Sequence, residues 1–221
     1  MNHSKTILIL PSILLITLPL LTTTGRCEEI RSKKTGTQQE NVLYRESLAL
    51  VEARDYKSAI KSITSYLKEN NTSPEAYFLR GKSYHELGIL DKASADYKKS
   101  IELDPRSSYK AHNNNGLIYG EINSYELAIE SFTKAIKANP KSKEAYNNRG
   151  VAKAASGDNN GAVKDFSKSI NIDNTYLEPL LNRSFVYEMK GQLDKACSDW
   201  KVASKMGSKN ARIWHKHQCQ S

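Results

Sequence analysis

Apolar and polar residues alternate along the chain with the spacing of helices, and this pattern repeats. Between residues 74 and 105 two apolar stripes of helical period are separated by a turn at Gly88 and closed by Pro105. The pattern returns twice, with Asn123 and Gly157 in the position of Gly88. It predicts antiparallel helix pairs joined by short turns, and no useful stretch has the two-residue period of a strand.

The repeated unit carries small and aromatic residues at fixed places. Gly81, Gly116 and Gly150 follow one another at steps of 35 and 34 residues. Small residues stand at the eighth and twentieth places of each unit, and mostly aromatic ones at the eleventh and twenty-fourth. This arrangement closely resembles the tetratricopeptide repeat family, whose units are paired antiparallel helices. The resemblance implies an all-α fold, a right-handed superhelical solenoid in which each unit packs on its neighbours.

The register of the repeat divides most of the chain into five units and a cap. The units span residues 40–73, 74–107, 109–142, 143–176 and 177–210, with Ser108 as a one-residue insertion. In each unit we expect helices over about places 2–14 and 18–30. Residues 211–221 continue the register as the first helix of a further unit, and we expect this helix to close the open end of the stack.

The N-terminal residues 1–25 have the layout of a secretory signal peptide. Lys5 precedes an apolar run, and small polar residues follow it. The run contains Pro11 and Pro19 and is shorter than the roughly 20 residues that a membrane-spanning helix needs. We therefore expect an exported protein of bacterial type, periplasmic or secreted, with a retained membrane anchor as the alternative.

The segment after the predicted signal is polar. Residues 26–39 are charged and polar without an apolar period, which predicts a flexible linker. Cys27 at its start resembles the acylated cysteine of bacterial lipoproteins, but Arg26 departs from that pattern. Membrane association is therefore expected only if the N-terminus is retained or Cys27 is lipidated.

Composition excludes some classes of function. The 221 residues carry a net charge of +9, and 38% are hydrophobic, which suits a solenoid without a deep common core. The basic residues lie mostly on the second helices and the tail without interleaved aromatic residues, so we expect a solvated face and no nucleic-acid partner. The sequence contains no phosphate-binding loop and no nucleophile elbow, and we predict neither enzymatic activity nor a cofactor. His215 and Cys219, four residues apart, make only a weak metal pair.

Arginine and aspartate recur together at two places of the repeat. The arginines at place 7 are Arg80, Arg149 and Arg183, and the aspartates at place 23 are Asp96, Asp165 and Asp199. In units one and three both places hold other residues. Because place 7 lies on the first helix and place 23 on the second, we interpret these residues as interhelical ion pairs, a role that suits the planar guanidinium group.

Asparagine recurs at place 6 in Asn114, Asn148 and Asn182. In the repeat family this place looks toward the concave groove, and a similar asparagine ladder in O-linked N-acetylglucosamine transferase-type repeats holds extended peptide backbone. An amide offers a donor and an acceptor, as main-chain recognition requires. The alternative is that asparagine is simply common at this place. The other predicted groove residues are Phe78, Lys82, Asn113, Asn147 and Phe185.

These patterns predict a non-catalytic protein–protein interaction scaffold or adaptor of the cell envelope, a monomer that binds a peptide segment in the groove of the repeats. The Lys and Asn clamp of chaperone-binding repeats is not reproduced, so chaperone tails are disfavoured as ligands. The alternative is a non-catalytic structural subunit of an envelope enzyme or assembly complex, held through Phe78, Phe185 and Met189.

Cys197 and Cys219 are the only cysteines in the predicted repeat region. Export would place them where disulfides persist, and Cys219 lies on the helix that should pack against the helix of Cys197. Terminal repeats of some bacterial proteins, with Ala-Cys-x-Asp-Trp and a closing cysteine, look similar. We predict a disulfide, with a buried free Cys197 as the alternative.

Overall fold

The structure is a computed structural model that describes residues 42–106 and 108–219. Residues 42–52 are helical. The helices that follow are α2 (Tyr56–Glu69), α3 (Pro74–Glu86), α4 (Leu90–Leu103), α5 (Tyr109–Glu121), α6 (Tyr125–Ala138), α7 (Lys143–Ala155), α8 (Asn159–Ile172), α9 (Glu178–Met189), α10 (Leu193–Lys205) and α11 (Lys209–Gln218). Across these two ranges the secondary structure is helix and turn only.

The predicted signal peptide, the linker and Cys27 lie outside the described residues. Within residues 42–106 and 108–219, no helix combines the length and the apolar character that crossing a lipid bilayer requires.

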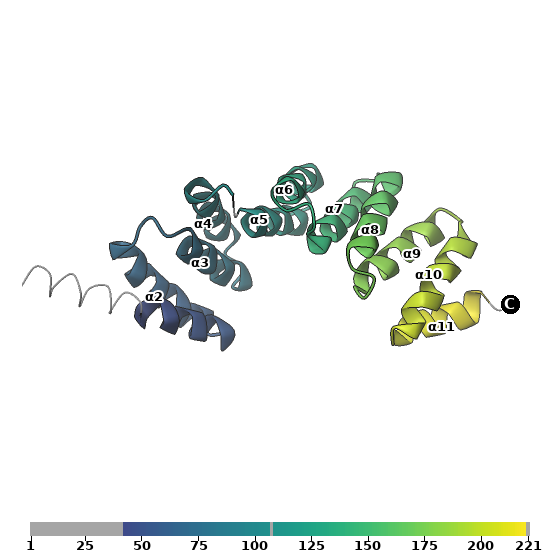
Figure 1. The fold of residues 1–221 in the computed structure, drawn as a ribbon, viewed down its shortest axis with the longest axis horizontal. Helices are drawn as coiled ribbons and strands as arrows, with labels where there is room; N and C mark the ends of the chain where they lie inside the picture. Colours follow the sequence, from purple (N-terminus) through teal and green to yellow (C-terminus); the bar gives the residue numbers. More distant parts are fainter. Residues whose placement is uncertain (1–41, 107, 220–221) are drawn as a thin grey trace, which may run out of the picture. The chain divides into compact units, whose positions relative to one another are not determined.

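Successive helices form pairs, and each pair packs on the next (Figure 1). The pairs are α3 with α4, α5 with α6, α7 with α8, and α9 with α10, and α11 packs against α10. The first helices of neighbouring pairs, α3, α5, α7 and α9, also contact one another in order. This is the all-α solenoid that the repeat predicts.

The turns inside the pairs share one backbone conformation. Two residues before each second helix, the backbone enters the left-handed region, at Gly88 (φ 71°), Asn123 (φ 58°), Gly157 (φ 92°) and Gly191 (φ 67°). Glycine, and after it asparagine, adopts this conformation at the lowest cost, which explains the residue types at these places.

The first helices α3, α5 and α7 begin at place 1 of their units, one place before the approximate start that the register predicts, whereas α9 begins at place 2. Ser73 caps α3 by accepting a hydrogen bond from the backbone N–H of Ala76, and Pro74 occupies the first helical position. Ser142 caps α7 in the same way. The start of these helices is therefore fixed by a capping side chain rather than by the apolar stripe.

The glycine at place 8 lies against the aromatic ring at place 24 of the same unit. A Cβ atom on Gly150 would lie 2.7 Å from the ring of Phe166, and one on Gly116 would lie 2.6 Å from the ring of Phe132. Both rings are buried. The missing side chain therefore lets the two helices approach closely enough to bury the ring between them.

Candidate functional site

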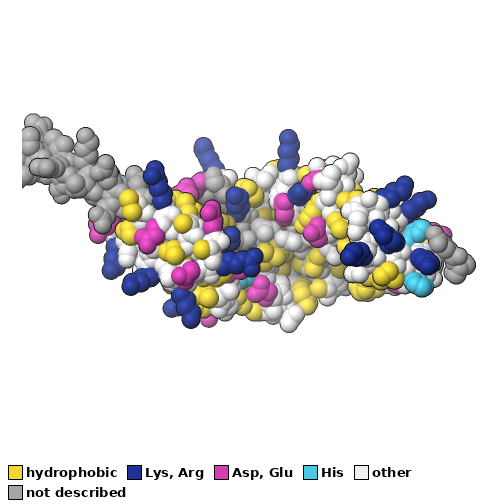
Figure 2. All heavy atoms as spheres, turned by 90° about the horizontal axis from the view of Figure 1, so that it is seen from below, with side chains coloured by type: hydrophobic (Ala, Val, Ile, Leu, Met, Phe, Trp, Pro, Cys, Tyr) yellow, Lys and Arg dark blue, Asp and Glu magenta, His cyan; other side chains and the backbone are white. Residues whose placement is uncertain are grey.

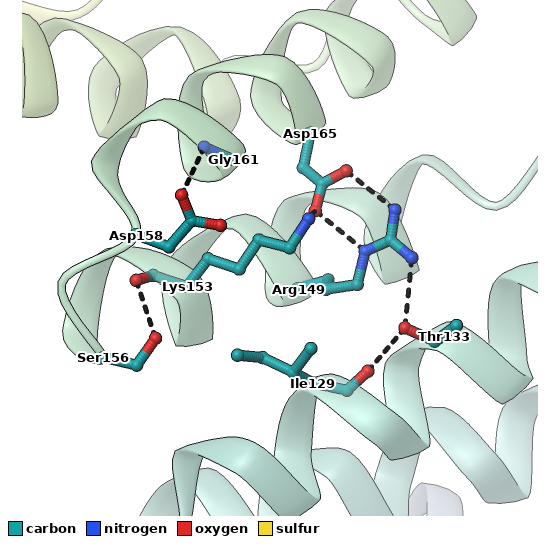
Figure 3. A network of polar contacts seen from close by, with 8 residues as sticks. All are labelled: Ile129, Thr133, Arg149, Lys153, Ser156, Asp158, Gly161 and Asp165. Carbon is teal, nitrogen blue, oxygen red and sulfur yellow. Dashed lines mark hydrogen bonds and ion pairs between the residues drawn. The ribbon is translucent and has the colours of Figure 1, made fainter.

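The arginines at place 7 bind both neighbouring helices. The guanidinium of Arg149 on α7 donates from Nε and Nη2 to the two carboxylate oxygens of Asp165 on α8, both at 2.8 Å. Its Nη1 donates to the hydroxyl of Thr133 on α6, in the preceding pair, at 3.1 Å (Figure 3). Lys153 also contacts Asp165, at 2.8 Å.

Two more arginines make the same contacts, to an aspartate of their own pair and to a hydroxyl of the preceding pair. Arg80 joins Asp96 to Thr64, and Arg183 joins Asp199 to Ser167. The hydrogen bonds that Arg183 donates to Asp199 are the main cause that raises the pKa of Arg183 above its usual value. The place-7 arginines thus contact neighbouring helices, and the charge of each is balanced by an aspartate at place 23.

Unit three has no arginine and aspartate at these two places. Asn115 and Ser131 occupy places 7 and 23 there, and both are buried. The Oδ1 atom of Asn115 has no hydrogen-bond partner within the described ranges. At this junction the contact of His85 on α3 with Glu121 on α5, at 2.8 Å, joins the two pairs in place of an arginine.

The asparagine ladder is hydrogen-bonded within the chain. The side-chain amide of Asn148 donates to Oδ1 of Asn113 at 3.1 Å, and that of Asn182 donates to Oδ1 of Asn147 at 3.0 Å. Asn114 donates to the hydroxyl of Tyr97 at 3.1 Å. Places 5 and 6 of neighbouring first helices therefore form inter-repeat contacts, a role that the sequence pattern did not indicate.

Two apolar hollows open between the first helices of units three to five. One, of about 330 Å³, lies between α5 and α7, and the other, of about 400 Å³, lies between α7 and α9. Val151 and Ala155 line both of them, and each hollow contains one ladder residue, Asn148 or Asn182. The ladder thus borders a surface of apolar side chains, here called the apolar groove.

Exposed apolar residues recur along the apolar groove at place 9. They are Leu117 on α5, Val151 on α7 and Phe185 on α9, with exposed fractions of 36%, 46% and 59%. Met189, four residues after Phe185, is also exposed and lines the second hollow. In Figure 2 hydrophobic side chains gather along the middle of the face, and Lys and Arg side chains are more frequent toward its ends.

The predicted groove residues differ in their placement. Phe185 is exposed, whereas Asn147 is buried. Phe78 is half-buried, with its ring centroid 5.6 Å from that of Tyr97. Together with the exposed Lys82 it lines a separate hollow of about 440 Å³ between α3 and α5.

Place 9 of the first helices is assigned to the groove from the sequence, with Leu117 and Val151 at that place, although only Phe185 of the three is singled out for binding. Their recurrence with Phe185 at one place of the repeat was the available signal. The recurrence places the three side chains on one side of the first helices, but the neighbouring helices determine how much of each is exposed.

The cap is joined covalently to the last pair. Cys197 on α10 and Cys219 at the end of α11 form a disulfide with Cα atoms 5.7 Å apart. The rings of Trp200 and Trp214 lie 6.0 Å apart beside it. Because Cys219 is in the disulfide, it cannot serve as a thiolate ligand with His215. No group of three or more metal-ligating side chains comes together in the part of the chain that the structure describes.

This geometry defines a class: a helical-repeat solenoid with an exposed apolar surface on its first helices. Models of the tetratricopeptide repeat match residues 74–107 and 143–176, and a model of the TPR repeat matches residues 116–157. The chain therefore contains tetratricopeptide repeats.

Known proteins share these repeats over much of the chain. Human "Tetratricopeptide repeat protein 6" is 29% identical over 158 residues, 70% of this chain and 30% of that protein. A "DnaJ homolog subfamily C member 7 homolog" of Dictyostelium discoideum is 22% identical over 86% of this chain and 38% of its own length. The chain thus spans well under half of these relatives. A crystal structure of MamA is similar with a TM-score of 0.67 and 25% identity, covering 75% of this chain and 96% of MamA.

Proposed function

We propose that the protein is a non-catalytic scaffold that binds an unstructured peptide segment of a partner protein in the apolar groove. The observation that carries this proposal is the recurrence of exposed Leu117, Val151 and Phe185 on three successive first helices. A continuous apolar surface with amide groups beside it is typical of a binding site, because a ligand covers the apolar atoms and satisfies the remaining donors.

The relatives support a role in protein–protein interaction. Tetratricopeptide repeats recur in proteins whose names describe work on other proteins, such as the "Mitochondrial import receptor subunit TOM70" of Rattus norvegicus, which is 24% identical over 83% of this chain. The chain covers 29% of that protein.

We further propose that the protein is exported and works in the cell envelope. Two observations support this location: the signal-like pattern of residues 1–25 and the disulfide between Cys197 and Cys219. Disulfides persist in oxidising compartments and are rare in the cytosol. Fractionation of the native cells, with the protein recovered only from cytosol, would contradict the proposal.

The binding function is tested with a collection of unstructured peptides of diverse composition. Peptides that bind the wild type with micromolar affinity should lose binding to Val151→Asp, because a carboxylate in the groove removes apolar contact. Leu127→Asp is the matched control, since Leu127 has the same exposed fraction, 46%, but lies on the second helix α6. If no peptide in the collection shows binding that depends on Val151, the proposal fails.

The second candidate is a non-catalytic structural subunit of an envelope enzyme or assembly complex. The adjacent exposure of Phe185 and Met189, 59% and 52%, favours it, since a folded partner could cover both side chains. A stoichiometric complex that survives purification, together with no peptide binding by the isolated protein, would support this candidate over the first.

A further inference from the structure

The apolar groove is less basic than the chain as a whole, because every cation of α7 and α9 is paired with an aspartate outside these two helices. The pairs are Lys143–Asp173, Arg149–Asp165, Lys153–Asp165 and Arg183–Asp199. The aspartates lie on the second helices or directly after them. The positive charges of α7 and α9 are therefore neutralised by carboxylates on the side of the second helices.

The glutamates of the same helices are exposed. Glu144 on α7 and Glu178 and Glu188 on α9 all lie at the surface. Glu144 precedes Asn148 by four residues, and Glu178 precedes Asn182 by four, so each carboxylate shares a helix face with a residue that lines a hollow. Glu188 follows Phe185 by three residues and lies on the same face.

Helix α5 also places an exposed carboxylate beside the apolar groove. Glu121 lines the first hollow with an exposed carboxylate and contacts His85 on α3 at 2.8 Å. Lys110, the exposed cation of α5, lines the hollow toward α3, and Glu144 of α7 lines that same hollow. Carboxylates on α5 and α9, those of Glu121, Glu178 and Glu188, thus lie beside the apolar groove, within a protein of net charge +9.

We propose that the peptide segment held in the apolar groove is cationic and apolar, with Lys or Arg residues between large aliphatic or aromatic anchors. This proposal rests on the proposed function and names its partner class. Apolar anchors would fill the hollows, and the cations would meet the glutamates at the border, so that the potentials of the two surfaces are complementary.

The spacing of the helices indicates the spacing of the anchors. Neighbouring packed helices lie about 8–10 Å apart. A polyproline II segment rises about 3.1 Å per residue and presents every third residue on one side, which is about 9 Å. One anchor per first helix therefore corresponds to apolar residues three positions apart.

The test uses a fluorescent peptide of repeated Lys-Pro-Leu triplets and two matched peptides, one with Glu for Lys and one with Ser for Leu. Binding to the full-length protein is measured by fluorescence anisotropy. We expect the cationic peptide to bind at least about tenfold more tightly than either match, and its affinity to fall with added salt.

Charge reversal in the groove assigns the effect to named residues. Glu178→Lys and Glu188→Lys should each weaken binding of the cationic peptide by up to about fivefold and strengthen binding of the acidic one. Glu130→Lys on α6 is the control, because Glu130 is an exposed carboxylate on a second helix. Circular dichroism verifies that the variants keep their helical content.

Three results would overturn this proposal. One is equal affinity for the cationic and acidic peptides, and another is an equal effect of Glu188→Lys and Glu130→Lys. The third is self-association that Phe185→Ala abolishes, which would make a second copy of the chain the occupant. The proposed function itself survives these results if the diverse peptide collection still contains ligands that depend on Val151, so the two failures are distinguishable.

Discussion

Arg149 and Asp165 form a two-point ion pair between α7 and α8, with both N–O distances at 2.8 Å. The remaining donor of Arg149 reaches Thr133 on α6, so one side chain closes its own helix pair and attaches it to the pair before. The side chains of Arg149 and Asp165 are 16% and 7% exposed. Partial burial makes the loss of one partner more costly than the loss of the whole pair.

Asp165→Ala should lower the free energy of unfolding by about 3 kcal/mol, because it leaves the cations of Arg149 and Lys153 without their carboxylate. Adding Arg149→Leu should recover part of the loss. Urea unfolding of the four proteins in the double-mutant cycle measures the coupling. The exposed pair Lys134–Glu130 serves as the control and should couple by less than about 0.5 kcal/mol. A cycle without coupling at Arg149 and Asp165 would refute the pairing.

Gly150→Ala should destabilise the protein, whereas Gly120→Ala should not. The new Cβ at position 150 would lie 2.7 Å from the buried ring of Phe166, while a Cβ at position 120 meets no atom within 4 Å. We expect a loss of about 1–3 kcal/mol at Gly150 from overpacking. At Gly120, inside α5, we expect a gain of up to about 1 kcal/mol from helix propensity. Equal melting temperatures of the two variants would contradict the close packing of place 8.

Asn182→Ala should lower stability as well as affect binding. It removes the donor to Oδ1 of Asn147, a buried residue, and an unsatisfied buried acceptor costs about 1–3 kcal/mol. The double variant Asn147→Ala with Asn182→Ala should therefore lose less than the sum of the single losses. Chemical unfolding measures this. If Asn182→Ala melts like the wild type, the inter-repeat hydrogen bond has no energetic role, and the ladder is free for ligand.

Reduction of the Cys197–Cys219 disulfide should release α11 from the stack. The disulfide spans 22 residues, and a loop of this size contributes about 3 kcal/mol by restricting the unfolded chain. Hydrogen exchange should become faster in α11 on reduction and stay unchanged in α5, which serves as the internal control. Mass spectrometry without reductant should find no free thiol at either cysteine. Two free thiols there would exclude the bridge.

His112 should make the stability of the fold depend on pH. Burial, with a smaller effect of Lys134, lowers the pKa of this half-buried imidazole below its usual 6.5. The unfolded chain therefore binds the proton more readily, and stability should decrease as the pH falls from about 6.5 toward the lower pKa of the folded state. His112→Gln should remove this part of the pH dependence. The comparison requires urea unfolding of both proteins at about pH 7.5 and pH 5.5, and parallel pH profiles would contradict it.

The sequence alone determined the helix pairs and their turns. The recurrence of Gly81, Gly116 and Gly150 gave the period, and the left-handed turns fall at Gly88, Asn123 and Gly157, where the pattern placed them. These features could be predicted because they depend on local conformation and on a repeated apolar spacing. Both depend on residues that are close together in the chain.

Tertiary structure decided how the polar side chains of one unit meet the next. Spacing placed Asn148 on a helix face, but its hydrogen bond to Asn113, 35 residues away, depends on the approach of α5 and α7. Likewise, Arg149 reaches Thr133 only because α6 packs against α7. The exposure of Val151 has the same origin, since a repeat pattern shows which side of a helix is apolar, while the neighbouring helices determine how much of that side they cover.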